Sequence, residues 1–369
     1  MNTVGDNPST DQEASASSIF HNAFGRRAFL SSSGKAVLAV GLVSVGRKLA
    51  NGIYAANTLA EVRTKSIKLQ ESYINNAEFA GYYVASKKGF YHKYGLTVDL
   101  LSGGTTIDPR TIVADGGAQI GIVSETSDVL IGIAEGVPYK CIGAAFQTNP
   151  GCLMVLGSSK IYKVKDLEGT TIGIQDNARQ QVLGILKANK VPPDKVNILV
   201  VGTDPGSLVE GKVDAYTAFA FNEPIALKMK GIATRCYSFS NIGLAGYGDN
   251  VIAMDHTITS TRETLARFMR ASQEGWAYAI THPEDAVSIT LTDYPSDQTP
   301  KQQKLQMEVQ IPMVRSAWTK HHGLLSIDPS VWAKAIKAAK QSKALAKPVS
   351  VKESLTETIL ARAAHVRPV

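Results

Sequence analysis

The side chains best suited to bind a small molecule stand directly after apolar runs of the sequence. Ser124 and Glu125 follow one such run, and Asn222 and Glu223 stand a few residues beyond another. Amides both donate and accept hydrogen bonds, whereas ionised carboxylates only accept them. This combination suits a neutral nitrogen heterocycle, whose ring and amino groups present both kinds of partner. The complete set of expected ligand-binding residues is Asn76, Phe79, Ser124, Glu125, Gln147, Asp176, Asn177, Arg179, Asn222, Glu223 and Tyr247.

Several of these residues also have an ordinary structural interpretation. Asn76 either meets a polar ligand atom at a helix N-terminus or caps that helix, and Phe79 either stacks on a planar ring or fills the core. Asn222 and Glu223 precede Pro224, so they also fit a helix start, where an acidic side chain is favourable. Both interpretations stay open from the sequence.

The same alternatives apply to the remaining candidates. Ser124 and Glu125 either bind ligand or cap a helix, and Gln147 either offers its amide or lies in a solvated turn. Arg179, which follows Asp176 and Asn177, either binds an anion through two hydrogen bonds or pairs with a surface carboxylate. Tyr247 either closes over a ligand or belongs to a hinge.

The sequence holds no motif that would support catalysis or a metal site. It contains no GxSxG, P-loop, HExxH or GxGxxG pattern. His321 and His322 are adjacent and would diverge on a helix, without a third ligand at useful spacing. Cysteines stand at positions 141, 152 and 236, and we expect buried thiols, with a 141–152 disulfide as the alternative. We therefore expect no catalytic residue, metal or cofactor.

Length and composition indicate a globular protein of two lobes. The chain has 369 residues, of which 44% are hydrophobic and 19% charged. The formal net charge is +7, and the first 55 residues account for +2 of it. The other basic residues are scattered without an aromatic-interleaved stripe, so nucleic-acid binding is not expected.

The N-terminal residues 1–55 are interpreted as a disordered segment and a twin-arginine export signal. Arg26 and Arg27 precede Phe29 and Leu30, which is typical of that signal. The apolar run at 36–43 is too short to span a bilayer. We expect cleavage near residues 55–56, export by the twin-arginine translocase and a soluble periplasmic protein.

The elements that would position the candidate residues alternate between strand and helix. This alternation predicts an α/β fold with mostly parallel sheets. Strands are expected at 66–72, 96–101, 119–123, 139–146, 170–174, 196–200, 213–217, 232–237 and 250–254. Helices are expected at 78–88, 111–114, from 124 toward 135, 177–189, 207–210, after Pro224, and at 262–282, 284–292, 299–320, 329–341 and 351–364.

The order of these elements divides the chain into two lobes. Residues 66–152 plus 255–369 would form lobe I, and residues 156–249 would form lobe II. The chain would cross between them near 152–156 and near 250–254. A ligand cleft is expected between the lobes, because loops at the carboxyl ends of parallel strands converge there.

Five segments together resemble a known protein family. They are Asn76–Ala85 with the following KGFY and YGLTV runs, KDLEGTTIG at 165–173, GKVDA at 211–215, Asn222-Glu223-Pro224, and GWAYAI at 275–280 with HPEDA at 282–286. This order is similar to that of ABC-transporter substrate-binding proteins of the nitrate/sulfonate/taurine type, in particular their NMT1/THI5-like branch. The resemblance covers roughly residues 66–340.

The resemblance implies a type II periplasmic-binding fold, two lobes around a ligand cleft, and handover of the ligand to a permease with a cytoplasmic ATPase. We therefore expect a monomeric solute-binding component of an ABC importer. Its ligand is expected to be a nitrogen heterocycle, such as a thiamine-pyrimidine precursor or a riboflavin-like compound. The alternatives are a sulfonate or nitrate-type anion, and a THI5-like pyrimidine-synthesising enzyme, whose cysteine-rich run this sequence lacks.

Overall fold

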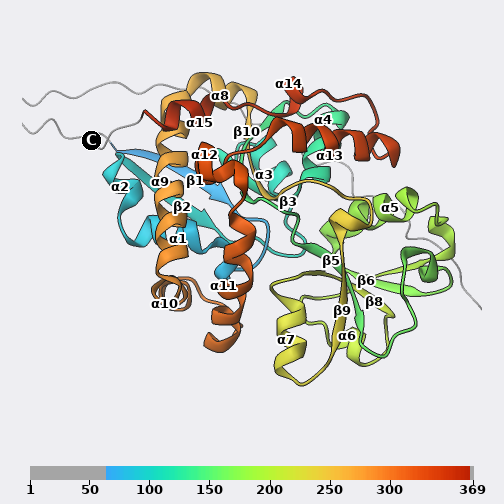
Figure 1. Ribbon diagram of the computed structural model, residues 1–369. Coiled ribbons are helices and arrows are strands. Elements are labelled where there is room, and N and C mark those ends of the chain that lie inside the picture. The colour runs from blue at the N-terminus through green and yellow to red at the C-terminus, as the bar shows by residue number, and fades with distance from the viewer. Residues whose placement is uncertain (1–63, 366–369) are drawn as a thin grey trace, which may run out of the picture. The chain divides into compact units, whose positions relative to one another are not determined.

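The computed structural model describes residues 64–365, apart from the side chain of Asn177. Arg26, Arg27 and the rest of the expected export signal lie outside the described residues. Within residues 64–365, no helix is both long and apolar enough to cross a membrane. Figure 1 shows the arrangement of the helices and strands.

Two five-stranded sheets organise the described chain. The first sheet has the order β2-β1-β3-β10-β4 and the second has the order β7-β6-β8-β5-β9. The strands of the first sheet are β1 (Lys65–Gln70), β2 (Leu96–Leu101), β3 (Ile120–Glu125), β4 (Tyr139–Phe146) and β10 (Gly248–Met254). Those of the second are β5 (Gly151–Leu156), β6 (Thr171–Ile174), β7 (Asn197–Val200), β8 (Ala215–Phe219) and β9 (Thr234–Ser238).

Each sheet is parallel except for one strand. In the first sheet β1 pairs in parallel with β2 and β3, while β10 runs antiparallel to β3 and β4. In the second sheet β6 pairs in parallel with β7 and β8, while β5 runs antiparallel to β8 and β9. The predicted α/β fold with mostly parallel sheets is confirmed. We call the first sheet with its helices lobe I and the second with its helices lobe II.

Helices cover both faces of the sheet in lobe I. They are α1 (Ala80–Lys87), α2 (Phe90–Lys93), α3 (Pro109–Ala114), α4 (Thr126–Glu135), α8 (Asp255–Ser260), α9 (Arg262–Thr281), α10 (Pro283–Asp293), α11 (Pro300–Val314), α12 (Ala317–His322), α13 (Pro329–Gln341), α14 (Val351–Ser354) and α15 (Thr358–Ala363). One apolar cluster joins α1, α9, α10, α11 and α15 to the sheet, and another joins α3, α4 and α13 to it.

Lobe II repeats this layering with fewer helices. Its helices are α5 (Arg179–Ala188), α6 (Gly206–Val209) and α7 (Glu223–Met229). One apolar cluster contains Val182 and Ile185 of α5, and a second contains Leu208 of α6 and Leu227 of α7. Figure 1 shows α6 and α7 next to the second sheet. The chain enters this sheet after residues 147–150 and leaves it before β10, so both crossings lie immediately before the segments expected for them.

Two expected helices are interrupted. The helix predicted at 299–320 ends at Val314, because Pro312 lacks a backbone N–H, and α12 restarts behind Ser316, whose hydroxyl accepts from the Thr319 N–H. The helix predicted at 351–364 is broken between α14 and α15. There the Thr356 N–H donates to the Cys141 carbonyl at 3.0 Å, which draws the chain onto the edge of β4.

The expected disulfide alternative is not present in the structure. Cys141 lies in β4 of the first sheet and Cys152 in β5 of the second, and both thiols are free and buried. Cys236, in β9, is free and exposed. The expectation of buried thiols therefore holds for Cys141 and Cys152 and is wrong for Cys236, which lies in β9 at the edge of the second sheet.

The contact between α1 and α9 depends on two glycines. A Cβ atom on Gly275 of α9 would overlap the Gly81 carbonyl oxygen of α1, and one on Gly81 would overlap the Trp276 ring. The absence of side chains lets the two helix backbones approach closely, with the buried Trp276 ring packed against Gly81. Figure 1 shows α9 alongside α1 at the face of the first sheet.

Replacing Gly275 by alanine should therefore destabilise lobe I. We expect the Gly275→Ala variant to lose about 1–3 kcal/mol of unfolding free energy, since an added methyl group forces helix backbones apart. The Gly184→Ala variant in α5 is the matched control: its Cβ would meet only Leu244, at 3.4 Å. Helix propensity should leave that variant neutral or up to about 1 kcal/mol more stable. Urea unfolding of the two variants measures both effects, and equal stabilities would contradict the close helix contact.

Candidate functional site

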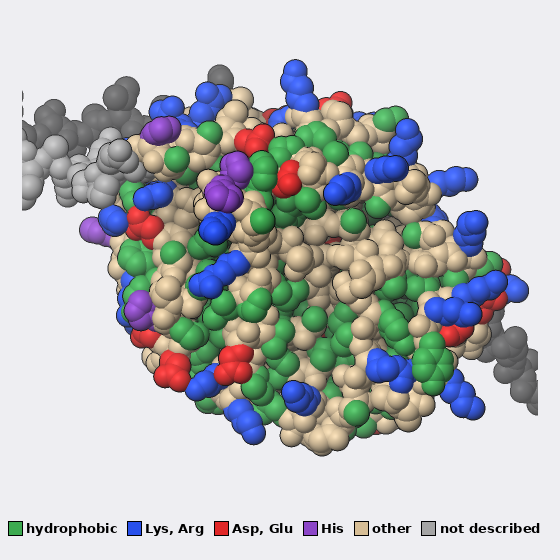
Figure 2. Space-filling view, viewed as in Figure 1, with side chains coloured by type: hydrophobic (Ala, Val, Ile, Leu, Met, Phe, Trp, Pro, Cys, Tyr) green, Lys and Arg blue, Asp and Glu red, His purple; other side chains and the backbone are tan. Residues whose placement is uncertain are grey.

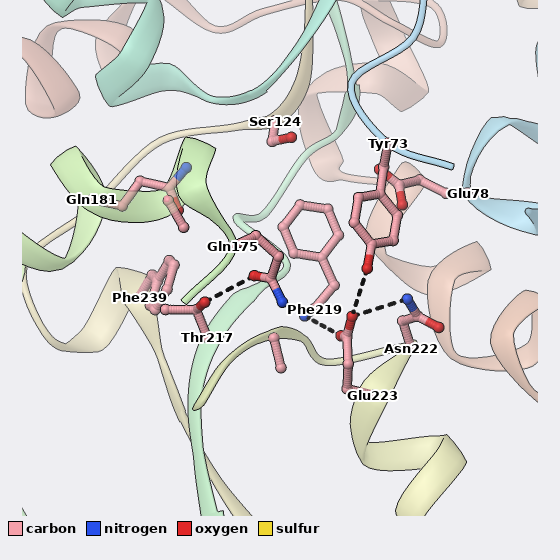
Figure 3. Close-up of a pocket in the computed structure, with 12 residues that line it drawn as sticks. Tyr73, Glu78, Ser124, Gln175, Gln181, Thr217, Phe219, Asn222, Glu223 and Phe239 are labelled. Carbon is pink, nitrogen blue, oxygen red and sulfur yellow. Dashed lines mark hydrogen bonds between the residues drawn. The ribbon is translucent and has the colours of Figure 1, made fainter. Parts of the chain in front are cut away.

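A pocket lies between the two sheets at the carboxyl ends of their parallel strands. Ser124 is the next-to-last residue of β3, Gln175 follows β6, and Phe219 ends β8. The space between atoms, including the part open to solvent, is about 500 Å³. Its lining residues, shown in Figure 3, are Tyr73, Glu78, Ser124, Gln175, Ala178, Gln181, Thr217, Ala218, Phe219, Asn222, Glu223 and Phe239.

Glu223 is the best-anchored polar group in this pocket. It begins α7, and its Oε2 accepts from the Phe219 backbone N–H at 2.9 Å. Its Oε1 accepts from the Asn222 side-chain amide at 3.1 Å and from the Tyr73 hydroxyl at 3.4 Å. Pro224 at the second helical position removes one N–H that would otherwise need a partner. These donors fix the carboxyl orientation, as Figure 3 shows.

Burial also changes the ionisation of Glu223. The side chain is 5% exposed, and desolvation raises its pKa to about 7 from its usual value of 4.5. The hydrogen bonds from Phe219, Tyr73 and Asn222 act in the opposite direction, because they favour the charged form. A carboxyl with this pKa changes charge close to neutral pH.

Polar contacts from lobe I hold the other side of the pocket. Gln298 and Gln302 donate to the Asn222 Oδ1 at 2.7 Å and 3.4 Å, and Gln302 belongs to α11. Gln181 of α5 donates to Asp128 of α4 at 2.8 Å. Together with the Tyr73–Glu223 bond, these contacts connect the two lobes on either side of the pocket.

Aromatic rings supply the apolar part of the wall. Tyr73, Phe219 and Phe239 all line the pocket and come from three different segments of the chain. Two hydrogen bonds fix the Gln175 side chain, which also lines the pocket. Its amide donates to the Tyr216 hydroxyl at 2.8 Å and accepts from the Thr217 hydroxyl at 2.9 Å. Flat aromatic faces next to fixed amides suit a planar ring with polar edges.

Glu78 adds a second buried carboxyl to the wall. It is 1% exposed, and its Oε1 has no hydrogen-bond partner among the described residues. Burial raises its pKa well above the usual range, and the neighbouring Asp249 carboxyl raises it further. Two adjacent buried carboxyls cannot both ionise, so at least one of the two keeps its proton. A protonated Glu78 can both donate and accept toward a ligand.

Five of the expected ligand-binding side chains lie at the cleft. Ser124, Asn222 and Glu223 line the pocket just described. Asp176 and Arg179 line an adjoining pocket that shares Ser124 with the first. Asn177 lies between these two residues in the short helix Asp176–Ala178, and its side chain is not described.

The other expected residues do not line either pocket. Asn76 caps the short helix Ala77–Phe79 by accepting from the Glu78 N–H at 2.7 Å, and Phe79 packs in the core against Tyr83. These are the ordinary structural roles that the sequence left open for both residues. Neither side chain lines the pocket.

Glu125, Gln147 and Tyr247 also have partners inside the protein. Glu125 accepts from the Asn149 amide. Gln147 donates to the Ser326 carbonyl at 3.1 Å, and the Tyr247 hydroxyl accepts from the Asp328 N–H at 2.9 Å. All three side chains are buried and bond to other groups of the protein, although the Oε1 atom of Glu125 has no partner among the described residues.

Several lining residues were missed as ligand-binding groups in the sequence. Tyr73 and Phe239 come just after β1 and β9, so the same strand-end signal that indicated Ser124 applied to them as well. Gln181 and Thr217 lie inside a helix and a strand, where no local signal distinguishes a lining position from any other. No group of His, Cys, Asp and Glu side chains within residues 64–365 is arranged to hold a metal ion.

Comparison with known proteins assigns the chain to a family. A family model described as NMT1/THI5 like matches residues 76–286, which is more than half of the chain. The chain belongs to the NMT1/THI5-like family. The resemblance read from the sequence motifs is thereby confirmed.

Relatives of the chain carry names of binding proteins and of an enzyme. The riboflavin-binding protein RibY of Chloroflexus aurantiacus is 26% identical over 306 residues, which cover 80% of this chain and 86% of the relative. A formylaminopyrimidine-binding protein of Halalkalibacterium halodurans is 23% identical over 249 residues, with coverage of 66% and 75%. A relative from Legionella pneumophila, 22% identical over 227 residues with coverage of 60% and 72%, is named as a hydroxymethylpyrimidine phosphate synthase.

Solved structures show the same fold. The alkanesulfonate-binding protein SsuA of Xanthomonas axonopodis pv. citri, bound to MOPS, aligns with a TM-score of 0.60 and 14% identity. The alignment covers 80% of this chain and 99% of that protein. The chain of the NMT1/THI5-like family therefore has the two-sheet fold of periplasmic binding proteins.

The raised pKa of Glu223 predicts a specific dependence of stability on pH. The folded state holds this proton more tightly than the unfolded chain, so the stability that the proton confers is complete below about pH 4.5. It is lost as the pH rises through about 7. The Glu223→Gln variant should lose less unfolding free energy between these two pH values than the unchanged protein.

Urea unfolding at a series of pH values measures this difference. The Glu168→Gln variant is the matched control, because Glu168 is an exposed residue of lobe II that lines neither pocket. It should keep the pH dependence of the unchanged protein. Identical slopes for all three proteins would show that Glu223 titrates in the folded state as it does in the unfolded chain.

Proposed function

We propose that this protein is the solute-binding component of an ABC importer and that its pocket binds a planar nitrogen heterocycle. The main support for this proposal is the Glu223 carboxyl, which hydrogen bonds hold in place among aromatic side chains. Residues of both lobes line this pocket. A ring N–H or amino group can donate to Glu223 while the ring faces contact Phe219 and Phe239. The names of the riboflavin-binding and formylaminopyrimidine-binding relatives support this ligand class.

The charge of the pocket favours a heterocycle over a sulfonate or nitrate. Two carboxyls, Glu78 and Glu223, line it, and none of its described lining residues is Lys, Arg or His. An anion would therefore meet carboxyl groups without a balancing cation, at a buried position where such repulsion is strong. The SsuA structure supports the fold of the protein and not its ligand.

The composition of the pocket also favours binding over catalysis. Its described lining holds no Lys, Cys or His that could act as a nucleophile, and its Glu223 carboxyl is held by hydrogen bonds. The pyrimidine phosphate synthase among the relatives keeps an enzyme of the THI5 type as the alternative function.

Export and delivery complete the proposal. The Arg26-Arg27 pair supports export by the twin-arginine translocase, and the family relationship supports handover to a membrane permease with its ATPase. We expect a periplasmic monomer whose lobes close over the ligand by a hinge movement at the two crossings.

Nucleic-acid binding is not part of the proposal. On the face that Figure 2 displays, Lys and Arg side chains are spread out and do not form one stripe.

Isothermal titration of the purified protein tests the ligand class. We expect riboflavin or an aminopyrimidine to bind, and an alkanesulfonate and nitrate to bind at least tenfold more weakly. In the Glu223→Gln variant the heterocycle should bind about 10–100-fold more weakly, because a charge-assisted hydrogen bond contributes about 1.5–3 kcal/mol.

The Glu168→Gln variant makes the same substitution on the surface of lobe II and should bind like the unchanged protein. Binding of only the sulfonate or nitrate would overturn the heterocycle and keep the solute-binding role. Turnover of a pyrimidine compound by the purified protein would replace the binding role with the enzymatic alternative.

A further inference from the structure

A second pocket continues the first one along the cleft. Both are lined by Ser124 and Gln181, so they meet at these two side chains. The second pocket holds about 830 Å³ of space between atoms, including the part open to solvent. Its lining residues are Ser72, Thr105, Thr106, Ile107, Asp108, Pro109, Arg110, Val123, Ser124, Asp128, Asp176, Arg179, Gln180 and Gln181.

The loop after β2 forms the outer wall of this second pocket. Gly103 permits this, because a Cβ atom there would overlap the backbone of Glu71 and Tyr73. The Gly103 N–H donates to the Tyr73 carbonyl at 2.9 Å, which fixes the loop against the segment that follows β1. Thr105 and Thr106 are thereby placed along the same pocket as Ser72.

Ser72 has an unsatisfied hydroxyl group in this pocket. The residue is 2% exposed, and its Oγ has no hydrogen-bond partner among the described residues. Buried hydroxyl groups in folded proteins nearly always have a partner, since leaving one unpaired costs about 1–3 kcal/mol. A ligand atom that donates to or accepts from this oxygen would supply the missing hydrogen bond.

The charges in the second pocket nearly balance, with carboxyls in excess. Asp108 binds Arg110 at 2.7 Å, and Arg110 also donates to the Asp128 carbonyl at 2.9 Å. Asp128 accepts from Gln181 at 2.8 Å. With Asp176 and Arg179, the lining holds three carboxyls and two guanidinium groups.

This set of groups matches hydroxyl groups better than a phosphate. A hydroxyl donates to carboxylates such as Asp176 and accepts from guanidinium and threonine hydroxyl groups, so a chain of hydroxyls can bond to both kinds of group. A phosphate only accepts, and its negative charges would face the excess of carboxyls.

On the basis of the proposed heterocycle in the first pocket, we propose that the ligand also carries a neutral hydroxyl-bearing chain, which lies in the second pocket and hydrogen-bonds to Ser72. The ring occupies the aromatic pocket next to Glu223. The chain passes Ser124 and Gln181 and ends among Thr105, Thr106 and Asp176. The two pockets together form one bipartite site.

Three flavin probes separate the contributions of the two pockets in titrations that follow flavin fluorescence. Riboflavin carries the ring and a hydroxyl chain, lumichrome carries the ring without the chain, and flavin mononucleotide adds a phosphate to the end of the chain. We expect riboflavin to bind at least tenfold more tightly than lumichrome and at least tenfold more tightly than the mononucleotide.

The Ser72→Ala variant locates the chain. It should weaken riboflavin binding about 5–10-fold and leave lumichrome binding unchanged. The Ser72 hydroxyl has no partner within the described residues, so we expect that removing this hydroxyl does not lower the unfolding free energy. The Ser207→Ala variant is the matched control, because Ser207 also has an unpartnered hydroxyl but lines neither pocket. It should bind all three probes like the unchanged protein.

Each other outcome overturns the inference in a distinct way. Equal affinities for lumichrome and riboflavin would show that the second pocket binds no chain, while the ring pocket of the proposed function would stand. Tighter binding of the mononucleotide would show that the second pocket takes an anion. Binding of an aminopyrimidine without any flavin would exclude the chain-bearing ligand, and failure of every heterocycle would refute the proposed function itself.

Discussion

The burial of carboxyl groups, two of them lining the cleft and others in the neighbouring core, is the constraint on which the rest of the site depends. Burial raises the pKa values of Glu71, Glu78, Glu125 and Asp249 well above their usual ranges, and that of Glu223 to about 7. A charge removed from water costs several kcal/mol unless it is paired or neutralised. The protein accordingly provides donors, such as Tyr83 for Glu71, and the raised pKa of Glu78 favours its neutral form. Such an arrangement lowers stability and is typical of binding sites, where it selects ligands that donate hydrogen bonds.

The topology explains why these groups meet. Each sheet has three parallel strands side by side, and β3 and β8 occupy the third position in their sheets. The carboxyl ends of these strands place Ser124 and Phe219 at the same pocket. Because the two sheets repeat one strand order, loops from both contribute to a single cleft, which is where ligands bind in sheets of this kind. The helices α1 and α9, packed through Gly81 and Gly275, support the first sheet away from this edge.

Sequence patterns predicted the fold and part of the site because the ends of strands can be recognised in the sequence. They did not predict the whole site, because the direction in which a side chain points cannot be recognised there. Alternating apolar runs located the strands within a few residues, and polar residues after them included Ser124 and Glu223. Glu125 follows Ser124 by one residue, and successive residues of a strand point to opposite faces, so it faces Asn149 inside the protein. Tyr73 reaches the pocket through a partner 150 positions away in the chain. Such long-range pairing depends on how the lobes pack, which no local pattern encodes.

The contacts between the lobes suggest how a ligand would control closure. Tyr73–Glu223, Gln298–Asn222 and Gln181–Asp128 are hydrogen bonds that water can replace when the cleft opens, and each contributes only about 0.5–1.5 kcal/mol net. Opening would also rehydrate the Glu223 carboxyl, which burial disfavours in its charged form. The desolvation of Glu223 therefore opposes the few hydrogen bonds that join the lobes at the pocket. A ligand that donates to Glu223 while it contacts both lobes would offset this desolvation, and such differential affinity would shift the population toward a closed state.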